Sequence, residues 1–590
     1  MKKRILWTVI LLLIVLISIT ACAEDESKTV HILYTSDTHG FFRDWYYFAD
    51  ENTGHSGLTR IASAVKAERE KDAGLIVLDG GDIFQDNQAQ VFLPGSGYAE
   101  IHPMAKVMNA VGYDAWACGN HEFNWGMDEL MQLKDQMAAP MLCANVTRNG
   151  VPIGQRFVIL ERNGLRIAVI GAVTPNIAYW DGDRLKDYEI LDPAEEINRA
   201  ITEIGDGADV FVALLHMGIE NELGTSHSGC CDIAQLCPGV DVILSAHSHA
   251  SFADTMLNGV LTVENRNYAQ TAVLLEITVT GPEKNVNVSA RVIDAADFEE
   301  DEDTLALTAH EDETAKQIAA MPVGVLMGGD LISGQTGTGI CSVALEDTPW
   351  MQLIADCERY WSGADVCSVF AMETLNEVRE GIVDNMAIGS MYPYNNNTLY
   401  LLSMTGAQLK TYLEWANQLY RTYQPGDLTV AYNEGIRFYN HHMLDGVNYA
   451  IDLSREPGSR IVSLSWPDGK PVREDDVFTL VVSDYSANSQ LLVPGVIFGE
   501  GEELPVLLET DLHSEVGSMQ QLLIEYIKSA LGGVIHPSCD DNWHLTGCEW
   551  DTELHEEALL LIGEGLLQPQ HSDDGRTPNI RPFTKKDLGK

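Results

Sequence analysis

Five short polar clusters along the chain combine aspartate, asparagine and histidine in a way that could bind metal ions. Imidazole, carboxylate and amide groups suit divalent ions such as zinc, manganese, iron or cobalt, and no thiolate is required. One aspartate can bridge two such ions, which lie about 3.5–4 Å apart in two-metal sites. The candidate ligands for two divalent metal ions are Asp37, His39, Asp82, Asn120, His216, His247 and His249.

The complete set of clusters is a stronger signal than any single one. The sequences DTH and HSH each place two donors on the same side of an extended chain. The glycines of GGD let the backbone come close to a site. A lone histidine after a strand is more often a structural residue, and GNHE alone could form a turn or cap a helix. Five clusters in order, including LLHMG, favour a metal site over chance.

The elements that must position these clusters are strands, because each cluster follows a short apolar run. Helical patterns lie between several runs, for example at 58–70 and 127–137. This alternation predicts an α/β layered domain with largely buried strands. Functional groups in such folds gather at the C-terminal ends of the strands. The predicted strands before the clusters are residues 30–34, 75–78, 115–117, 210–215 and 242–244.

The length of 590 residues is too great for one hydrophobic core. An acidic stretch near residue 296 precedes a helix-compatible segment, and a second alternation of apolar runs begins after Pro322. The tail is polar, with scattered proline and glycine, and we expect it to be poorly ordered. The predicted organisation is a signal segment at 1–22, a first domain at 29–295, an acidic linker and helix at 296–322, a second domain at 323–563 and a polar tail at 564–590.

The first residues have the features of a secretory signal. A basic start precedes the apolar run 5–19, and small residues come before Cys22. The Thr20-Ala21-Cys22 sequence resembles a bacterial lipobox, in which the cysteine is lipidated, and the apolar run is short for a membrane span. We expect a lipoprotein anchored outside the cytoplasm, on a bacterial cell surface or in the periplasm. A plain cleaved signal and an uncleaved single-span anchor are the alternatives.

The formal net charge of -50, from 87 acidic and 37 basic residues, argues against long nucleic acids as partners. Nucleic-acid binding depends on lysine and arginine displacing counterions, and an acidic surface repels phosphate polymers. A small phosphate ester is still compatible with this charge, because bound cations reverse the field locally.

With these motifs the chain resembles the calcineurin-like metallophosphoesterases, and within them the 5′-nucleotidase family. The third motif reads GNHEFNWG, where the family's general form is GNHEFD. With Asn124, the motif resembles that of the 2′,3′-cyclic-nucleotide 2′-phosphodiesterase/3′-nucleotidase branch, which reads GNHEFNYG. The last cluster ends in His249, as in that branch, where 5′-nucleotidases usually place glutamine. Further matches to the branch are residues 391–399, 405–410 and 445–449.

The resemblance covers residues 29 to about 530 and has implications for fold and chemistry. It implies a layered α-β-β-α sandwich followed by a second α/β nucleotidase C-terminal domain. A hydroxide made available by two metal ions would attack phosphorus, and the ions would neutralise the charge that develops on the phosphate oxygens. The ligands would divide into two sets that share Asp82: Asp37, His39 and His249 for one ion, and Asn120, His216 and His247 for the other.

Two residues next to the ligands match catalytic positions of the family. His121 matches its catalytic histidine and would act as an acid or charge stabiliser near the ester oxygen. In 5′-nucleotidases an aspartate orients this histidine. Asn124 can still accept a hydrogen bond from the ring, but it supplies no negative charge. This departure fits the branch and also leaves open a weakened or inactive enzyme.

The family stacks the nucleobase between two aromatic side chains of the C-terminal domain, and this contact tolerates any base because each has a π face. Tyr439, with Asn440 beside it, and Tyr485 match these positions. Each tyrosine could also be an ordinary core or surface aromatic. Two departures bear on the substrate: His441-His442 replaces the usual Phe-Asp, and residues 370–374 replace an apolar, phosphate-side loop.

The leading interpretation is an extracytoplasmic, metal-dependent phosphoesterase that hydrolyses nucleoside 2′,3′-cyclic phosphates and 3′-nucleotides. The alternative enzyme is a 5′-nucleotidase or nucleotide-sugar hydrolase with the same metals. An alternative of another class is a catalytically inactive, nucleotide-binding lipoprotein, which the complete set of competent ligand positions disfavours. The expected partners are a small nucleotide and, through the lipid anchor, a membrane.

Overall fold

The computed structural model describes residues 27–182, 184–222, 224–281, 284–332, 342–370, 377–394, 397–514, 516–572 and 577–590. The signal segment with Cys22, and residues 371–374 of the segment that replaces the phosphate-side loop, lie outside the described residues. Within the described part of the chain, no helix has the length and apolar character needed to cross a membrane. The chain forms two compact units, one of residues up to 45 and 52–312, the other of residues 46–51 and 313–590.

Two six-stranded sheets form the centre of the first unit. The first sheet has the order β15 (Asn285–Asp294), β14 (Thr271–Thr280), β1 (Ser27–Thr35), β2 (Ile76–Asp79), β3 (Ala115–Ala117), β4 (Met141–Leu142). The second has the order β12 (Phe252–Leu257), β13 (Val260–Glu264), β11 (Val242–Leu244), β10 (Val210–His216), β8 (Leu165–Val173), β7 (Phe157–Arg162). A small third sheet contains β6 (Val151–Pro152), β5 (Val146–Arg148) and β9 (Glu189–Ile190).

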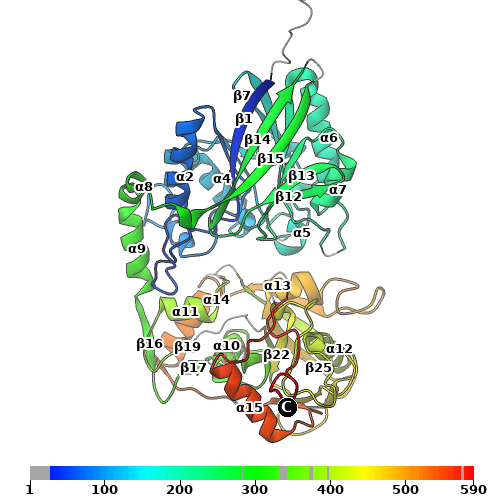
Figure 1. The fold of residues 1–590 in the computed structure, drawn as a ribbon. Coiled ribbons are helices and arrows are strands. Elements are labelled where there is room, and N and C mark those ends of the chain that lie inside the picture. Colours follow the sequence, from blue (N-terminus) through cyan, green and yellow to red (C-terminus); the bar gives the residue numbers. More distant parts are fainter. Residues whose placement is uncertain are drawn as a thin grey trace, which may run out of the picture. The chain divides into compact units, whose positions relative to one another are not determined.

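Apolar side chains from both large sheets form a core, because alternate residues of each strand point to the same face. Val30, Ile32 and Tyr34 of β1 are fully buried in it, together with Val212 and Leu214 of β10. Figure 1 shows helices on both outer sides of these sheets, which confirms the predicted α-β-β-α sandwich. The helices of this unit are α2 (Leu58–Lys71), α3 (Pro103–Val111), α4 (Met127–Gln136), α5 (Ile177–Trp180), α6 (Pro193–Ile204) and α7 (Cys230–Leu236).

The five strands predicted before the polar clusters are present as β1, β2, β3, β10 and β11. β1, β2 and β3 run parallel in one sheet, and β10 and β11 run parallel in the other. Each polar cluster supplies its first ligand at the strand's last residue or within three residues of it. The strands therefore carry all seven candidate ligands to their C-terminal ends.

Two short helices, α8 (Glu302–Leu307) and α9 (Ala309–Ala319), follow the sandwich. The composition predicted one helix here. The break lies at Thr308, whose hydroxyl donates to the carbonyl of Thr304 at 2.8 Å and whose backbone leaves the helical region. The division between the two units falls between Asp312 and Glu313, within α9.

The second unit is also α/β, as predicted. Its main sheet has the order β22 (His442–Asp445), β18 (Val366–Phe370), β25 (Val477–Ser483), β21 (Leu399–Thr405), β26 (Val506–Leu512). Smaller sheets contain β20 (Gly381–Asp384), β16 (Pro322–Leu326) and β27 (Val534–Ile535); β24 (Ile461–Ser465), β23 (Asn448–Asp452) and β28 (Trp543–Thr546); and β17 (Leu331–Ile332) with β19 (Glu377–Val378). The helices are α10 (Pro349–Ser362), α11 (Asn385–Met391), α12 (Gly406–Ala416), α13 (Asp484–Ser486), α14 (Met519–Glu525) and α15 (Thr552–Gly563).

The 405–410 motif has a structural explanation in this unit. Thr405 and Gln408 form a reciprocal capping box at the start of α12, which satisfies two backbone N–H groups. A side chain at Gly406 would place its Cβ 2.0 Å from the carbonyl oxygen of Arg473, so only glycine fits. The motif therefore has a structural role at the start of α12.

The polar tail differs from its predicted disorder. Phe583 is 3% exposed, and its carbonyl accepts a hydrogen bond from the backbone of Leu428. The carbonyl of Asn579 accepts another from Tyr432, and the Asn579 side chain is fully buried. The prediction from composition was wrong because a few buried residues and backbone hydrogen bonds are enough to order a mostly polar segment.

Candidate metal centre

The structure brings all seven predicted ligands together. Six of them form two candidate metal-binding groups, in each of which the donor atoms lie within 4.8 Å of one another: Asp37, His39 and His249, and Asp82, His216 and His247. Asn120 joins the second group, because its Oδ1 lies 3.0 Å from His216 Nε2 and 2.8 Å from His247 Nδ1. The two groups coincide with the two implied sets, except that the sharing of Asp82 by both ions stays a prediction.

Most of the ligands occupy left-handed backbone conformations that non-glycine residues rarely adopt. Such conformations cost about 1–3 kcal/mol each and persist only where surrounding contacts fix them. Gly81 is also left-handed (φ 96°), and a Cβ there would lie 2.5 Å from the backbone nitrogen of Gly119. The strained ligands are Asp37 (φ 51°), His39 (φ 43°), Asp82 (φ 55°), His247 (φ 77°) and His249 (φ 58°).

Backbone hydrogen bonds fix the first two ligand loops to each other. The amides of Asp37, His39 and Gly40 donate to the carbonyls of residues 81, 82 and 83, at 2.9, 3.0 and 2.9 Å. The amide of His247 donates to the carboxylate of Asp37 at 3.0 Å, so the loop after β11 is tied to the loop after β1. The ligand positions are thus set by the fold itself.

The donor chemistry fits divalent cations, because acceptor atoms face one another. His247 Nε2 lies 3.0 Å from the Glu222 carboxylate, which makes it the protonated nitrogen of the neutral ring. Its Nδ1 then faces Asn120 Oδ1 at 2.8 Å, and both atoms are acceptors. The Nε2 atoms of His39 and His249 lie 3.1 Å apart, so at most one proton can lie between them. A cation would satisfy all of these lone pairs.

Burial and neighbouring charges set the protonation of two of these rings. Burial lowers the pKa of His216, but the carboxylates of Asp82 and Asp37 outweigh this effect and raise the pKa to about 10. Burial lowers the pKa of His39 to about 4. The surroundings of His216 therefore stabilise positive charge, and the same carboxylates would stabilise a divalent ion.

Several supporting residues were missed by the sequence reasoning. Gln85 Oε1 lies 2.8 Å from His39 Nδ1, and the carbonyl of Gly80 accepts from His216 Nδ1 at 2.8 Å. Glu222 supports His247 in the same way. Glu122 accepts from the backbone amides of Asp82, Ile83 and Gly119 at 2.6–2.9 Å, which joins the second and third loops. Glu122 and Gly80 had a signal, as the last residue of GNHE and the first of GGD, whereas Gln85 and Glu222 lie in no recognisable pattern.

His121 and Asn124 lie beside the metal-binding groups. The backbone amide of His121 donates to Asp82 Oδ1 at 2.8 Å, and its ring centroid lies 5.5 Å from that of His39. His121 Nδ1 lies 2.7 Å from Asn124 Oδ1, as expected from the sequence. In the described part of the chain, no hydrogen bond to a protein group uses His121 Nε2.

The predicted substrate-binding residues lie together in the second unit. The rings of Tyr439 and Tyr485 contact each other edge to face, with centroids 6.0 Å apart and planes at 88°. Asn440 Oδ1 accepts a hydrogen bond from Gln490 Nε2 at 2.9 Å, which links the two segments that carry the tyrosines. A base could stack on either ring as it stands, and would have to separate the rings to lie between both.

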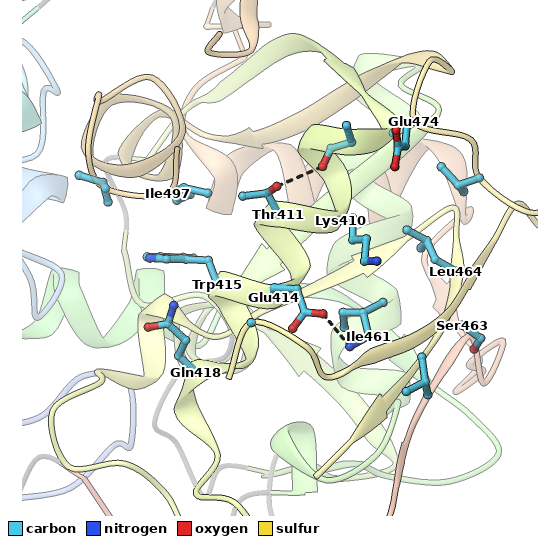
Figure 2. A pocket seen from close by; sticks show the side chains of 16 residues that line it. Lys410, Thr411, Glu414, Trp415, Gln418, Ile461, Ser463, Leu464, Glu474 and Ile497 are labelled. Carbon is cyan, nitrogen blue, oxygen red and sulfur yellow. Dashed lines mark hydrogen bonds between the residues drawn. The ribbon is translucent and has the colours of Figure 1, made fainter. Parts of the chain in front are cut away.

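A cavity of about 690 Å³ in the second unit is lined by α12, β24 and residues 496–497 (Figure 2). None of the predicted substrate-binding residues lines it. Its most buried polar group, Glu414, accepts hydrogen bonds from the backbone amides of Arg460 and Ile461 at 2.8 and 2.9 Å. The carboxylate therefore joins α12 to the start of β24, which is a structural role.

Comparisons with known proteins agree with this geometry. A profile of the calcineurin-like phosphoesterases matches residues 30–251, and one of the 5′-nucleotidase C-terminal domain matches residues 322–492. A 2′,3′-cyclic-nucleotide 2′-phosphodiesterase/3′-nucleotidase from Haemophilus influenzae is 26% identical over 93% of this chain and 94% of its own length. The trifunctional nucleotide phosphoesterase YfkN of Bacillus subtilis is 26% identical over 91% of this chain, but the match spans only 40% of YfkN.

A solved structure shows the same fold at lower identity. The 5′-nucleotidase precursor of Thermus thermophilus superposes with a TM-score of 0.57 and 19% identity, and covers 88% of this chain and 100% of its own. The two matched domains follow one another in the order that the sequence motifs predicted. The chain therefore belongs to the calcineurin-like metallophosphoesterases of the 5′-nucleotidase family, and is a hydrolase of that family.

Proposed function

We propose that this hydrolase cleaves nucleoside 2′,3′-cyclic phosphates and 3′-nucleotides outside the cytoplasm, with two divalent metal ions. The observation that carries the proposal is the convergence of two donor groups beside a histidine that is paired with asparagine. The cyclic phosphodiesterase relative from Haemophilus influenzae, which matches over nearly the whole chain, supports the same substrate class.

When bound, two divalent cations would supply a water of lowered pKa and neutralise charge on the phosphate oxygens. The residues that would hold them are the seven ligands named above. His121 supports ester cleavage from beside this centre: with Nδ1 hydrogen-bonded to Asn124, the protonated ring can donate from Nε2 to the departing ester oxygen. The amide of His121 donates to Asp82, which keeps the histidine in register with the ligand loop.

The second unit supplies nucleobase recognition in this proposal. Tyr439 is 38% exposed and Tyr485 is half-buried, so an aromatic face is accessible for stacking. Tyr439→Leu should raise KM for nucleotides by about tenfold, since one stacked base contributes about 1–3 kcal/mol. The KM for p-nitrophenyl phosphate, which has no base, should not change. Equal effects on both substrates would assign Tyr439 to the fold instead.

The cellular location is part of the proposal. Cys22 would carry the lipid, because it follows Thr20-Ala21 after an apolar run. Labelled palmitate should enter the wild-type protein and be absent from Cys22→Ser expressed in the same bacterial host. Unchanged labelling of Cys22→Ser would refute the anchor and leave a plain signal or single-span anchor.

A substrate panel tests the central proposal. The purified protein is given 2′,3′-cyclic AMP, 3′-AMP and 5′-AMP with added manganese or zinc, and after treatment with EDTA. We expect preference for the first two and loss of turnover after EDTA. Strong preference for 5′-AMP would instead identify a 5′-nucleotidase. No turnover of any ester by metal-loaded protein that binds nucleotide would identify a non-catalytic binding protein.

A further inference from the structure

Asn124 is hydrogen-bonded on both sides of its amide. Its Oδ1 lies 2.7 Å from His121 Nδ1, and its Nδ2 lies 3.2 Å from Asp181 Oδ2. Asp181 is 2% exposed and follows the last turn of α5. Its other oxygen, Oδ1, accepts from the Arg184 guanidinium at 3.1 Å. The four side chains thus form one chain of hydrogen bonds that ends on the histidine beside the metal-binding groups.

The direction of this chain is fixed by chemistry. Burial raises the pKa of Asp181, but the Arg184 guanidinium on its other oxygen favours the ionised form. An ionised carboxylate only accepts hydrogen bonds, so the Asn124 group that faces Asp181 must be the NH2 group. The Asn124 oxygen is then turned towards His121, where it can only accept. His121 Nδ1 must therefore carry a proton, which leaves Nε2 as the nitrogen directed to other partners.

We propose that Asp181 is the positioning residue for His121, acting through Asn124. In a His–Asp pair the negative charge lies directly against the histidine ring. Here the negative charge lies one residue further from the ring, on Asp181, a buried aspartate 57 positions after Asn124 in the sequence. Asn124 alone can rotate its amide and present NH2 to the ring, which is the wrong partner for a protonated Nδ1. Asp181 prevents that rotation. The inference rests on the proposed role of His121 in ester cleavage.

A reciprocal exchange of the two side chains tests the inference. In Asn124→Asp, two carboxylates would face each other at the 3.2 Å Asn124–Asp181 contact, and like charges at such a distance cannot both remain ionised. We expect kcat to fall by about tenfold or more. In the double variant Asn124→Asp with Asp181→Asn, the new amide can donate to the new carboxylate, and kcat should return to within about threefold of wild type.

The single variant Asp181→Asn completes the cycle. It should lower kcat in the wild-type background and raise it in the Asn124→Asp background, so the sign of its effect reverses. A purely structural role would give the same effect in both backgrounds, and that result would overturn the proposal. Asp187→Asn is the matched control, because Asp187 lies near the same loop with a side chain that is 79% exposed. Metal content should stay equal in all variants.

A second readout does not depend on turnover. In the full chain with diamagnetic zinc, long-range 1H–15N spectra of labelled histidine should show His121 protonated at Nδ1. Asp181→Leu, which cannot accept from Asn124, should give a mixture of tautomers and lower kcat without raising KM. An unchanged tautomer in Asp181→Leu would refute the positioning role. If His121→Ala retains turnover, the proposed catalytic role fails while the tautomer result still stands.

Discussion

His247 in the first unit and His442 in the second both lie in short histidine-rich sequences, yet their surroundings differ. Each ring directs Nε2 to an acceptor, Glu222 at 3.0 Å for His247 and Gln490 Oε1 at 2.9 Å for His442. The other nitrogen makes the difference. His442 Nδ1 faces the Ser368 hydroxyl at 3.2 Å, which can donate to it, whereas His247 Nδ1 faces the acceptor oxygen of Asn120.

The comparison shows how the surroundings of a structural histidine differ from those of a predicted metal ligand. Tyr412 can donate to Ser368, Ser368 to His442, His442 to Gln490, and Gln490 to Asn440, so each of these contacts pairs one donor with one acceptor. Burial lowers the pKa of His442 to about 3, which keeps the ring neutral. Around His247, Nδ1 and Asn120 Oδ1 lie 2.8 Å apart, and a divalent cation could bind both atoms.

The largest effect is expected when each histidine is replaced by asparagine. His247→Asn removes a predicted metal ligand, so we expect turnover to fall by more than about a hundredfold, with a loss of bound metal. His442→Asn should retain the wild-type metal content and lose stability instead. Plasma mass spectrometry and denaturant unfolding measure the two quantities. Equal metal content in the two variants would contradict the distinction.

The next effect is a dependence of stability on pH. The folded-state pKa of His442 is about 3, below the ordinary value of 6.5, so the unfolded chain takes up a proton first as pH falls. The stability that His442 contributes is present above pH 6.5 and is lost between about pH 6.5 and 3. Wild type should lose roughly 2 kcal/mol more than His442→Asn between pH 7 and pH 5. Parallel pH profiles of unfolding for the two proteins would show that His442 is not the titrating group.

The smallest effect concerns the carboxylate behind His247. Glu222 holds Nε2–H of that ring, and its side chain is 42% exposed, so Glu222→Ala should weaken metal affinity by about tenfold. Glu220→Ala removes a nearby exposed carboxylate and serves as the control. Competition with a chromogenic chelator measures both affinities. If Glu220→Ala weakens the affinity as much, the effect arises from net charge and not from orientation of the ring.

The sequence was sufficient for the parts of the centre that depend on strand ends. An apolar run followed by Asp-x-His or His-x-His is visible in one dimension, and parallel strands bring such runs to one edge. Asp181 and Glu222 were not visible, because each joins the site through a loop contact and no periodic pattern precedes it. The tail around Phe583 was misjudged for a related reason: its burial depends on a partner segment 154 residues away, at Thr429.

The loops after β1 and β2, which backbone hydrogen bonds join to each other, have a consequence for the choice of metal ion. Three backbone hydrogen bonds join these loops, and Asp37, His39 and Asp82 within them have left-handed backbones. A rigid set of donor atoms selects ions by radius and coordination geometry. A flexible set would instead bind divalent ions in their general order of affinity. We therefore expect the apo protein to resemble the loaded one at these loops, and ions of unsuitable size to be excluded rather than accommodated.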